Sequence, residues 1–496
     1  MKKNIKKILI ANRGEIVSRI IFTCKKLGIK TVAIYTKQDE FSKFVHEADE
    51  AYKLSTEGAS AYLNQKEIIN IAQQSNSDAI IPGYGFLSEN YQFVDLVTHN
   101  GLTWIGPKTQ TIKIMGSKTE SRKIAEKINV PIIPGFNLKL NEMEQGKKLG
   151  SKIGYPILLK DPLAGGGKAM RVVLNEKEFD SCWQRVASES EKLTSSNQIL
   201  LEKFIEKGRH VEIQIAGDGK NFIHLYEREC SIQRRNQKII EQTPCEFLDP
   251  KILNKMYSAA LKIAESTKYD NLGTVEFIVC PDQKFYFLEM NTRLQVEHSI
   301  TEFTTGLDLV ELQIKITQNK KLPIEQKNVS RKNFALECRI YAEDPEQNFA
   351  PSTGIINFLK IPDIFFGRID HNLEQNLEIT PFFDPMIAKV TTFGENKMAA
   401  IQNMLYVLEQ FKIIGIKNNI EFLQLILKTE EMQADQIHTQ LLTQKFLDKL
   451  FKTTHKTENH DEIIGAIAAT LLIPENKKAQ TNKTKSSNYW REKQWK

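Results

Sequence analysis

The decapeptide EMNTRLQVEH, at residues 289–298, alternates polar side chains with less polar ones. In a strand, successive side chains point to opposite faces, so one face would carry five polar groups in a row. A solvated face is the alternative, but such faces favour Lys, Glu and Thr. Two oxygen donors followed by a guanidinium and a carboxylate base predict a metal and anion site instead. The five groups are Glu289, Asn291, Arg293, Gln295 and Glu297.

Two β-rich runs precede Glu289. They are TVEFIV at 274–279 and KFYFL at 284–288. The intervening turn residues, PDQ, are typical of a hairpin. Glu276 on the first strand is then expected near Glu289 and Asn291 on the second. Three oxygen ligands at cross-strand distance suit Mg²⁺, which favours carboxylates together with substrate phosphates. A hairpin with its polar residues facing water is the alternative.

The composition is that of a globular protein with ample core. The chain has 496 residues, 41% hydrophobic and 26% charged, and this length predicts about two to four domains. The net charge is +7, but seven Lys/Arg and two Glu fall within 474–496. The near-neutral remainder argues against a nucleic-acid partner.

The cysteines and apolar segments bear on the cellular compartment. The six cysteines form no CxxC pair, which fits reduced thiols in the cytoplasm and argues against a disulfide frame or a zinc site. The apolar run ILIA at 8–11 is too short for a signal-peptide core, and no segment reaches membrane-spanning length. We therefore expect a cytoplasmic protein without a membrane partner.

Short apolar strands alternate with helical stretches over the first hundred or so residues, which predicts an open parallel α/β sheet. No GxGxxG follows the first strand, so dinucleotide binding has little support. A helix is expected from Lys118, and PILLK at 156–160 leads into the loop DPLAGGGKAMR. Glycines let backbone N–H groups approach phosphate oxygens, and Lys160 and Lys168 add charge. A merely flexible turn is the alternative.

A third unit is expected at roughly 335–447, followed by a short apolar helix at 461–473. The tail after Pro474 is rich in Lys, Asn and Ser, a composition typical of disorder. Docking of this tail to a partner subunit is the alternative.

Five motifs occur along the chain in a fixed order. Together they resemble biotin carboxylase, the ATP-grasp component of biotin-dependent acyl-CoA and pyruvate carboxylases. The resemblance runs from about residue 5 to about 447. The motifs are ANRGEI (11–16), PGYGFLSEN (82–90), ERECSIQRRNQK (227–238), EMNTRLQVEH (289–298) and ECRIYAEDP (337–345).

This resemblance implies a multidomain α/β and α+β fold. A Rossmann-like preATP-grasp domain would occupy 1–115, an ATP-grasp domain 116–330, and a biotin carboxylase C-terminal domain 335–447. A partly disordered extension would fill 448–496.

The resemblance also implies site residues. Glu276, Glu289 and Asn291 match the ligands of Mg²⁺ (or Mn²⁺), in agreement with the hairpin argument. Glu297 matches the base that deprotonates bicarbonate, and Arg339 matches the residue that faces the biotin ureido oxygen. The bicarbonate site is matched by Lys238, Arg293, Gln295 and Val296. The ATP site is matched by Lys118, Lys160, Gly166, Gly167, Glu202, Lys203, Phe204, Ile205 and His210, with Asn236 where the family commonly has a histidine.

The implied reaction converts bicarbonate and ATP to carboxyphosphate and then carboxylates biotin, which is carried on a partner. The family's carrier motif has its lysine after a methionine, and the only such pair here is Met1-Lys2. We therefore expect a separate biotin carboxyl carrier protein, a separate carboxyltransferase subunit and a homodimer. The final acceptor, whether acetyl-CoA in fatty acid synthesis, another acyl-CoA or pyruvate, depends on the carboxyltransferase.

The glycine loop departs from the family pattern, because Leu163 and Ala164 take the first positions of the usual glycine run. The proton-transfer, metal and bicarbonate residues are all retained, which predicts an active enzyme. A catalytically impaired ATP-binding structural subunit is the alternative. Another ATP-grasp ligase, such as a carbamoyl-phosphate synthase, has less support because three of the motifs together point to biotin.

Overall fold

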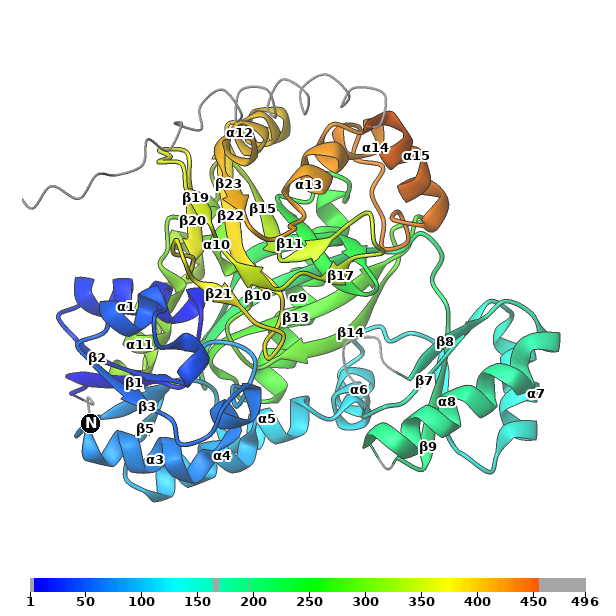
Figure 1. Ribbon diagram of the computed structural model, residues 1–496. Helices are drawn as coiled ribbons and strands as arrows, with labels where there is room; N and C mark the ends of the chain where they lie inside the picture. Colours follow the sequence, from blue (N-terminus) through cyan, green and yellow to red (C-terminus); the bar gives the residue numbers. More distant parts are fainter. Residues whose placement is uncertain (1–3, 164–168, 195, 455–496) are drawn as a thin grey trace, which may run out of the picture. The chain divides into compact units, whose positions relative to one another are not determined.

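A computed structural model describes residues 4–163, 169–194 and 196–454 (Figure 1). One compact unit extends to Thr443, and a second begins at Gln444. The described part of the second unit is helix α15 (Gln444–Thr454). Gly166, Gly167, the predicted apolar helix at 461–473 and the tail lie outside the described residues.

The amino-terminal part forms the predicted open α/β sheet. Its five strands are all parallel, in the order β3-β2-β1-β4-β5. Ile8, Leu9 and Ile10 are fully buried, as expected for a parallel strand covered on both faces. The strands are β1 (Lys7–Ile10), β2 (Lys30–Tyr35), β3 (Glu50–Lys53), β4 (Ala79–Ile81) and β5 (Thr103–Trp104). The helices are α1 (Glu15–Lys26), α2 (Lys43–Glu47), α3 (Gln65–Gln74), α4 (Tyr91–His99) and α5 (Thr109–Met115).

The expected helix at Lys118 is present. Ser117 caps it by accepting a hydrogen bond from the Glu120 amide. A four-stranded antiparallel sheet follows, in the order β6-β9-β7-β8. Phe179 and Trp183 fill the core between this sheet and its helices. The elements are α6 (Lys118–Lys127), β6 (Gly135–Lys139), α7 (Met143–Ile153), β7 (Ile157–Lys160), β8 (Met170–Val173), α8 (Phe179–Thr194) and β9 (Gln198–Lys203).

The largest sheet has eight antiparallel strands in the order β14-β13-β10-β11-β12-β15-β22-β20. Strand β12 pairs with β15, so residues of the second and third predicted domains share one continuous sheet. The strands are β10 (Arg209–Asp218), β11 (Phe222–Arg234), β12 (Gln237–Thr243), β13 (Asp270–Val279), β14 (Phe285–Asn291), β15 (Phe334–Tyr341), β20 (Gly367–His371) and β22 (Met386–Gly394).

The remaining helices are α9 (Pro250–Ser266), α10 (His298–Thr305), α11 (Leu309–Asn319), α12 (Lys397–Gln410), α13 (Ile420–Leu427) and α14 (Glu430–Gln433). The remaining strands are β16 (Glu343–Asp344), β17 (Ala350–Pro351), β18 (Gly354–Ile355), β19 (Phe358–Lys360), β21 (Glu378–Ile379) and β23 (Lys412–Ile414).

The predicted hairpin is present, with Glu276 opposite Glu289 across β13 and β14. The interpretation of 289–298 as one strand is wrong beyond Asn291, where β14 ends. The chain then turns, and α10 begins at His298. Leu294 and Glu297 are both fully buried, so a strand with one solvated face does not describe this segment. The turn gathers the polar side chains around one point rather than along one face.

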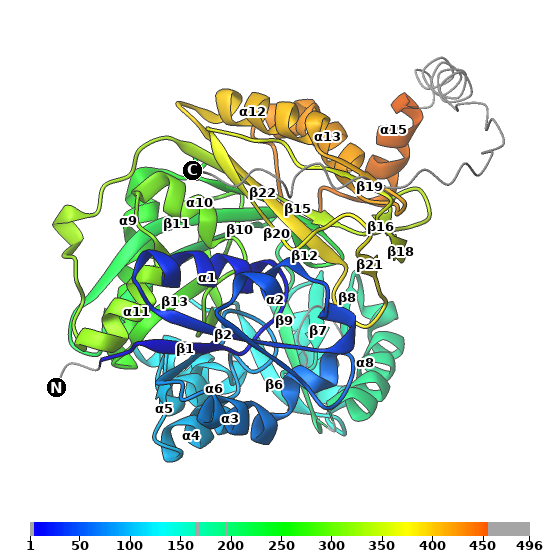
Figure 2. The same cartoon turned by 60° about the vertical axis from the view of Figure 1, so that its left-hand side comes forward.

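Helix α1 connects the amino-terminal sheet to later parts of the chain, since it contacts both β20 and α11 (Figure 2). The buried guanidinium of Arg19 donates to Glu302 at 2.6 Å and to Asp308 at 2.9 Å. Among the described helices, none is both long and apolar enough to cross a membrane.

Candidate functional site

The hairpin β13–β14 brings three oxygen-bearing side chains together. The Asn291 amide donates to Glu276 at 2.7 Å. Burial and the neighbouring charge of Glu276 both raise the pKa of Glu289, although Lys118 opposes them. A divalent cation between the two carboxylates would remove this repulsion, and carboxylate and amide oxygens are the ligands that Mg²⁺ accepts. The donor set therefore fits the predicted metal.

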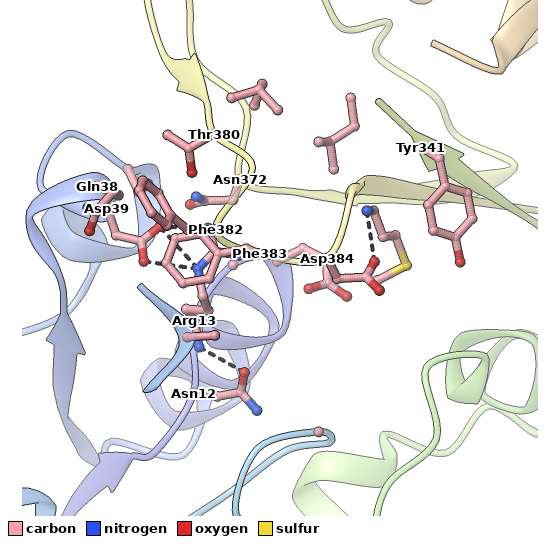
Figure 3. A pocket seen from close by; sticks show the side chains of 18 of the residues that line it. Asn12, Arg13, Gln38, Asp39, Tyr341, Asn372, Thr380, Phe382, Phe383 and Asp384 are labelled. Atoms are coloured by element: carbon pink, nitrogen blue, oxygen red, sulfur yellow. Dashed lines mark hydrogen bonds and ion pairs between the residues drawn. The ribbon is translucent and has the colours of Figure 1, made fainter. Parts of the chain in front are cut away.

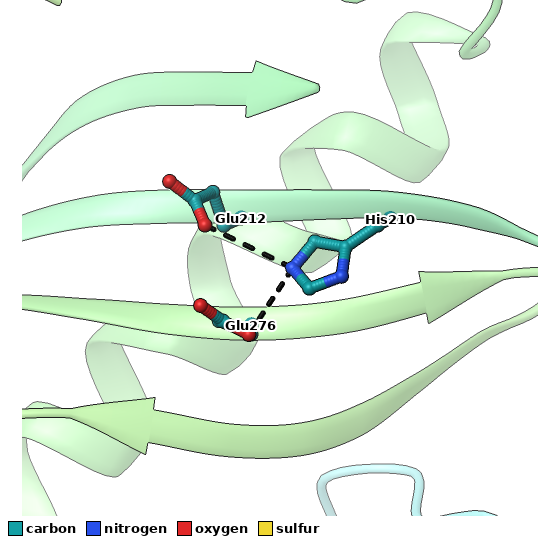
Figure 4. Close-up of side chains that lie close together, drawn as sticks. All are labelled: His210, Glu212 and Glu276. Carbon is teal, nitrogen blue, oxygen red and sulfur yellow. Dashed lines mark ion pairs between the residues drawn. The ribbon is translucent and has the colours of Figure 1, made fainter. Parts of the chain in front are cut away.

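A second side of this cluster comes from strand β10, which pairs with β13 (Figure 4). The Nε2 atom of His210 lies 3.1 Å from Glu276 and 3.8 Å from Glu212. Glu212 is directly opposite Glu276 and fully buried. Sequence reasoning missed Glu212, although its spacing of two from His210 places both side chains on one face of a strand.

Lys238 lies at the centre of the cluster. Its ammonium group donates to Glu212 at 2.6 Å, to Glu297 at 2.8 Å and to Glu276 at 3.0 Å. Burial disfavours the charged lysine, but these carboxylates outweigh burial and raise its pKa well above the usual value. The lysine therefore carries a permanent positive charge among three glutamates.

Glu297 is held between two cations. One carboxylate oxygen accepts from Lys238, and the other accepts from Arg339 at 3.0 Å. Burial alone would raise the pKa of Glu297, but Lys238 and Arg339 hold it well below the usual range. The group is thus ionised, which is the form that a general base needs. The fully buried Glu241 fixes Arg339, because its carboxylate accepts a hydrogen bond from the Nε atom of Arg339 at 2.6 Å. Glu241, like Glu212, was not predicted from the sequence.

Arg293 joins the hairpin to the loop after β4. Its Nε atom donates to Glu89 at 2.8 Å. Its two terminal nitrogens donate to Gln295 at 3.1 Å and to Asn291 at 2.8 Å. The predicted anion-binding and metal-binding residues are therefore in direct contact.

A cavity of about 510 Å³ adjoins Arg293 and Arg339, and Figure 3 shows the side of it that Arg13 and Phe383 line. Arg293, Val296 and Arg339 contribute to its wall. On another side, the Arg13 guanidinium pairs with Asp39 and lies 3.7 Å from the ring centre of Phe383. Arg293 and Arg339 thus offer guanidinium groups to a small anion in this cavity, and Arg339 also contacts Glu297.

Two of the predicted nucleotide residues, Lys118 and Lys160, lie near Glu202. This carboxylate accepts a hydrogen bond from Arg122 at 2.6 Å and forms an ion pair with Lys160 at 2.6 Å. Burial and the charge of Lys160 lower the pKa of Lys118, although Glu289 opposes them. Two neighbouring lysine charges next to the hairpin suit a polyphosphate.

Residues 203–205, which follow Glu202, are held by hydrogen bonds that each involve at least one backbone group. The Lys203 ammonium donates to the Gly154 carbonyl at 2.8 Å, and the Phe204 amide donates to Pro156 at 3.2 Å. The Ile205 carbonyl accepts from Gln440 at 3.0 Å.

Asn236 lies at the exposed two-residue turn between β11 and β12. Arg235 and Asn236 both have positive φ, 50° and 64°. This is the conformation of a hairpin turn in which asparagine is favoured, which gives a local reason for its presence.

Three family sequence models match consecutive parts of the chain. "Biotin carboxylase, N-terminal domain" matches 4–112, and "Carbamoyl-phosphate synthase L chain, ATP binding domain" matches 117–325. "Biotin carboxylase C-terminal domain" matches 337–444. Biotin carboxylase 2 of Bacillus subtilis is 42% identical over 440 residues, which cover 88% of this chain and 99% of that protein. The chain belongs to the biotin carboxylase family.

Other relatives agree with this assignment. The biotin carboxylase is 40% identical to the 2-oxoglutarate carboxylase small subunit of Hydrogenobacter thermophilus, over 88% of this chain and 93% of the relative. The crystal structure of the biotin carboxylase domain dimer of that organism's enzyme, with MgADP, ADP and bicarbonate, superposes with a TM-score of 0.85. That match has 40% identity and covers 89% of this chain and 97% of the other.

Longer relatives are also similar. Mouse methylcrotonoyl-CoA carboxylase subunit alpha is 40% identical over 95% of this chain, but the chain spans only 66% of that protein's length. The predicted resemblance and the three-domain α/β and α+β fold are thus confirmed. The matched ATP-binding domain and the similarity to a biotin carboxylase support an ATP-dependent ligase.

Proposed function

We propose that this biotin carboxylase uses Glu297 to deprotonate bicarbonate during its activation by ATP. The observation that carries the proposal is a fully buried carboxylate held between two cations, Lys238 and Arg339, of which Arg339 lines a cavity. Loss of the bicarbonate proton accompanies attack on the phosphoryl group, and a positioned carboxylate accepts it. Arrival of the anion gives the two cations a further partner, which would weaken their hold on Glu297 and free a carboxylate oxygen to take the proton.

Bicarbonate would be bound by Lys238, Arg293, Gln295 and the Val296 backbone. Two cations with a side-chain amide and a backbone N–H suit a small planar anion, because charge-assisted hydrogen bonds are strong and directional. The resulting carboxyphosphate releases CO₂ and phosphate, and the phosphate takes the N1′ proton of biotin. Arg339 would stabilise the negative charge that develops on the ureido oxygen. The product is carboxylated biotin.

ATP would lie between the four-stranded sheet and the hairpin. Glu276, Glu289 and Asn291 would hold Mg²⁺ (or Mn²⁺), which neutralises charge on the phosphoryl oxygens. Lys118 and Lys160 would contact the phosphates, and the segment Glu202 to Ile205 the adenine. Further contacts with the nucleotide would come from His210, Gly166, Gly167 and Asn236.

Biotin would arrive on a separate carrier protein, and a separate carboxyltransferase would use the product. The proposed acceptor is acetyl-CoA, for fatty acid synthesis, or a related acyl-CoA or pyruvate. Relatives are named for methylcrotonoyl-CoA, propionyl-CoA, pyruvate and 2-oxoglutarate.

We further propose a cytoplasmic homodimer with domains at 1–115, 116–330 and 335–447 and an extension at 448–496.

ATP hydrolysis by the purified chain tests this function. With Mg²⁺ and bicarbonate present, ADP release is expected to depend on bicarbonate and to rise when free biotin is added. Omission of bicarbonate should return the rate to background. Nucleotide binding without turnover under all these conditions would contradict the proposal and favour a structural subunit.

The variant Glu289→Gln tests the metal assignment. The Mg²⁺ concentration that gives half-maximal rate should rise at least about tenfold, because one of two anionic ligands is lost. Titration of ADP binding with and without Mg²⁺ gives a second measurement that needs no turnover. The matched control is Glu265→Gln, which neutralises an exposed glutamate of α9. An unchanged Mg²⁺ requirement in Glu289→Gln would remove this residue from the metal site.

A further inference from the structure

His298 is the fully buried first residue of α10. Its Nδ1 atom lies 2.9 Å from the carbonyl oxygen of Gln295. A carbonyl oxygen only accepts hydrogen bonds, so this contact, which is shorter than the 3.5 Å between Nδ1 and the Lys389 ammonium, places the proton on Nδ1. Burial, Lys389 and Arg19 lower the pKa of His298 well below its usual value. The imidazole is therefore neutral, and its single proton is on Nδ1.

Lys389 provides a second buried donor to the same turn. This fully buried lysine lies on β22, opposite Arg339 of β15. Its ammonium group donates to the carbonyl of Val296 in a short hydrogen bond. The two consecutive carbonyls of the turn, at Gln295 and Val296, thus each accept from a side chain beneath them.

The His298 bond acts on the Gln295–Val296 peptide, whereas the Lys389 bond acts on the next peptide, between Val296 and Glu297. The Gln295 carbonyl and the Val296 N–H belong to one amide group, and Val296 contributes to the cavity wall beside Arg293 and Arg339. A donor on the oxygen of an amide polarises the group and strengthens its N–H as a donor, since hydrogen bonds in a chain reinforce one another. The same bond fixes the plane of the peptide and hence the direction of the N–H.

We propose that His298 is a positioning residue, which orients and polarises the Gln295–Val296 peptide so that its N–H binds bicarbonate. This inference rests on the proposed function, in which the Val296 backbone contributes to the bicarbonate site. A purely structural histidine at the start of α10 is the alternative. The two differ because only the proposal predicts an effect specific to bicarbonate.

Two substitutions separate these roles. In His298→Asn, the amide nitrogen takes the place of Nδ1 and keeps the donor to Gln295. In His298→Gln, the amide nitrogen is placed nearer the position of Nε2, and the donor is lost. The KM for bicarbonate should rise about fivefold in His298→Gln, the size expected for one lost hydrogen bond. In His298→Asn it should stay within about twofold of the original, and the KM for ATP should be unchanged in both.

A measurement without turnover keeps this test separate from the test of the proposed function. In protein labelled with [¹⁵N]valine, the Val296 amide proton, assigned through Val296→Ile, should move upfield in His298→Gln and not in His298→Asn. If the Val296 signal shifts in His298→Gln but ATP hydrolysis by the original protein does not depend on bicarbonate, the polarised peptide exists and the proposed function fails. That result would also overturn the role of His298 in bicarbonate binding. Equal effects of both variants, or an unchanged Val296 signal and bicarbonate KM in His298→Gln, would overturn the proposal outright.

Discussion

Replacement of Glu297 by glutamine is expected to lower bicarbonate-dependent ATP hydrolysis at least about a hundredfold, the usual contribution of a positioned general base. The substitution keeps the shape of the side chain but removes its ability to accept a proton. Both cations keep other carboxylate partners, because Lys238 also contacts Glu212 and Glu276 and Arg339 also contacts Glu241. The rate should be measured as ADP release against bicarbonate concentration, with and without free biotin.

The exposed substitution Glu265→Gln serves as the control for this experiment and should leave the rate unchanged. ADP binding and the thermal unfolding midpoint of Glu297→Gln should stay close to those of the original protein, which would localise the defect to proton transfer. A variant that retains most of its bicarbonate-dependent rate would show that another group is the base.

The elements that carry the site were largely predictable because their patterns are local. Alternation of β-rich runs around a turn predicted the hairpin of β13 and β14, and the cross-strand approach of Glu276 to Glu289 follows from it. The helix expected from Lys118 is present, and Ser117 caps its first turn. The resemblance to biotin carboxylase extended these local predictions to the whole chain.

The strand prediction for 289–298 failed because alternation alone does not reveal where a strand ends. Polar residues at every second position also fit a turn whose side chains are mostly buried, and contacts with Glu89 and Lys389 favour that turn. Those partners lie about 90 to 200 residues away in the sequence, beyond the reach of any local pattern.

Glu212 and Glu241 were missed for a related reason. Each is one glutamate on a long buried strand, and only the pairing of β10, β12, β13 and β15 places them beside Lys238 and Arg339. A buried glutamate in a strand is unusual without a partner. A glutamate within an otherwise apolar strand therefore indicates that a cationic partner lies nearby. The sequence did not identify the partner.

Replacement of Arg228 by leucine is expected to give the largest loss of stability among these variants. Arg228 is fully buried and donates to Glu212 at 2.6 Å, to Gln214 at 2.7 Å, and to Thr274 and Thr301 at 3.0 Å each. It therefore links β10, β11, β13 and α10. Without it, Glu212 keeps a buried charge with one cation fewer, and breaking a buried pair in this way costs about 3–5 kcal/mol.

The measurement is the urea midpoint of unfolding, and Arg171→Leu is the matched control. Arg171 pairs with Glu189, but their side chains are 38% and 36% exposed, so the control should cost less than about 1 kcal/mol. The variant Arg228→Lys should lie between the two, because an ammonium group keeps the charge but not the planar set of donors that reaches four partners. Equal midpoints for Arg228→Leu and Arg171→Leu would mean that the buried network adds little to stability. A large difference would show that the carboxylates beside Lys238 depend on Arg228 for their place in the fold.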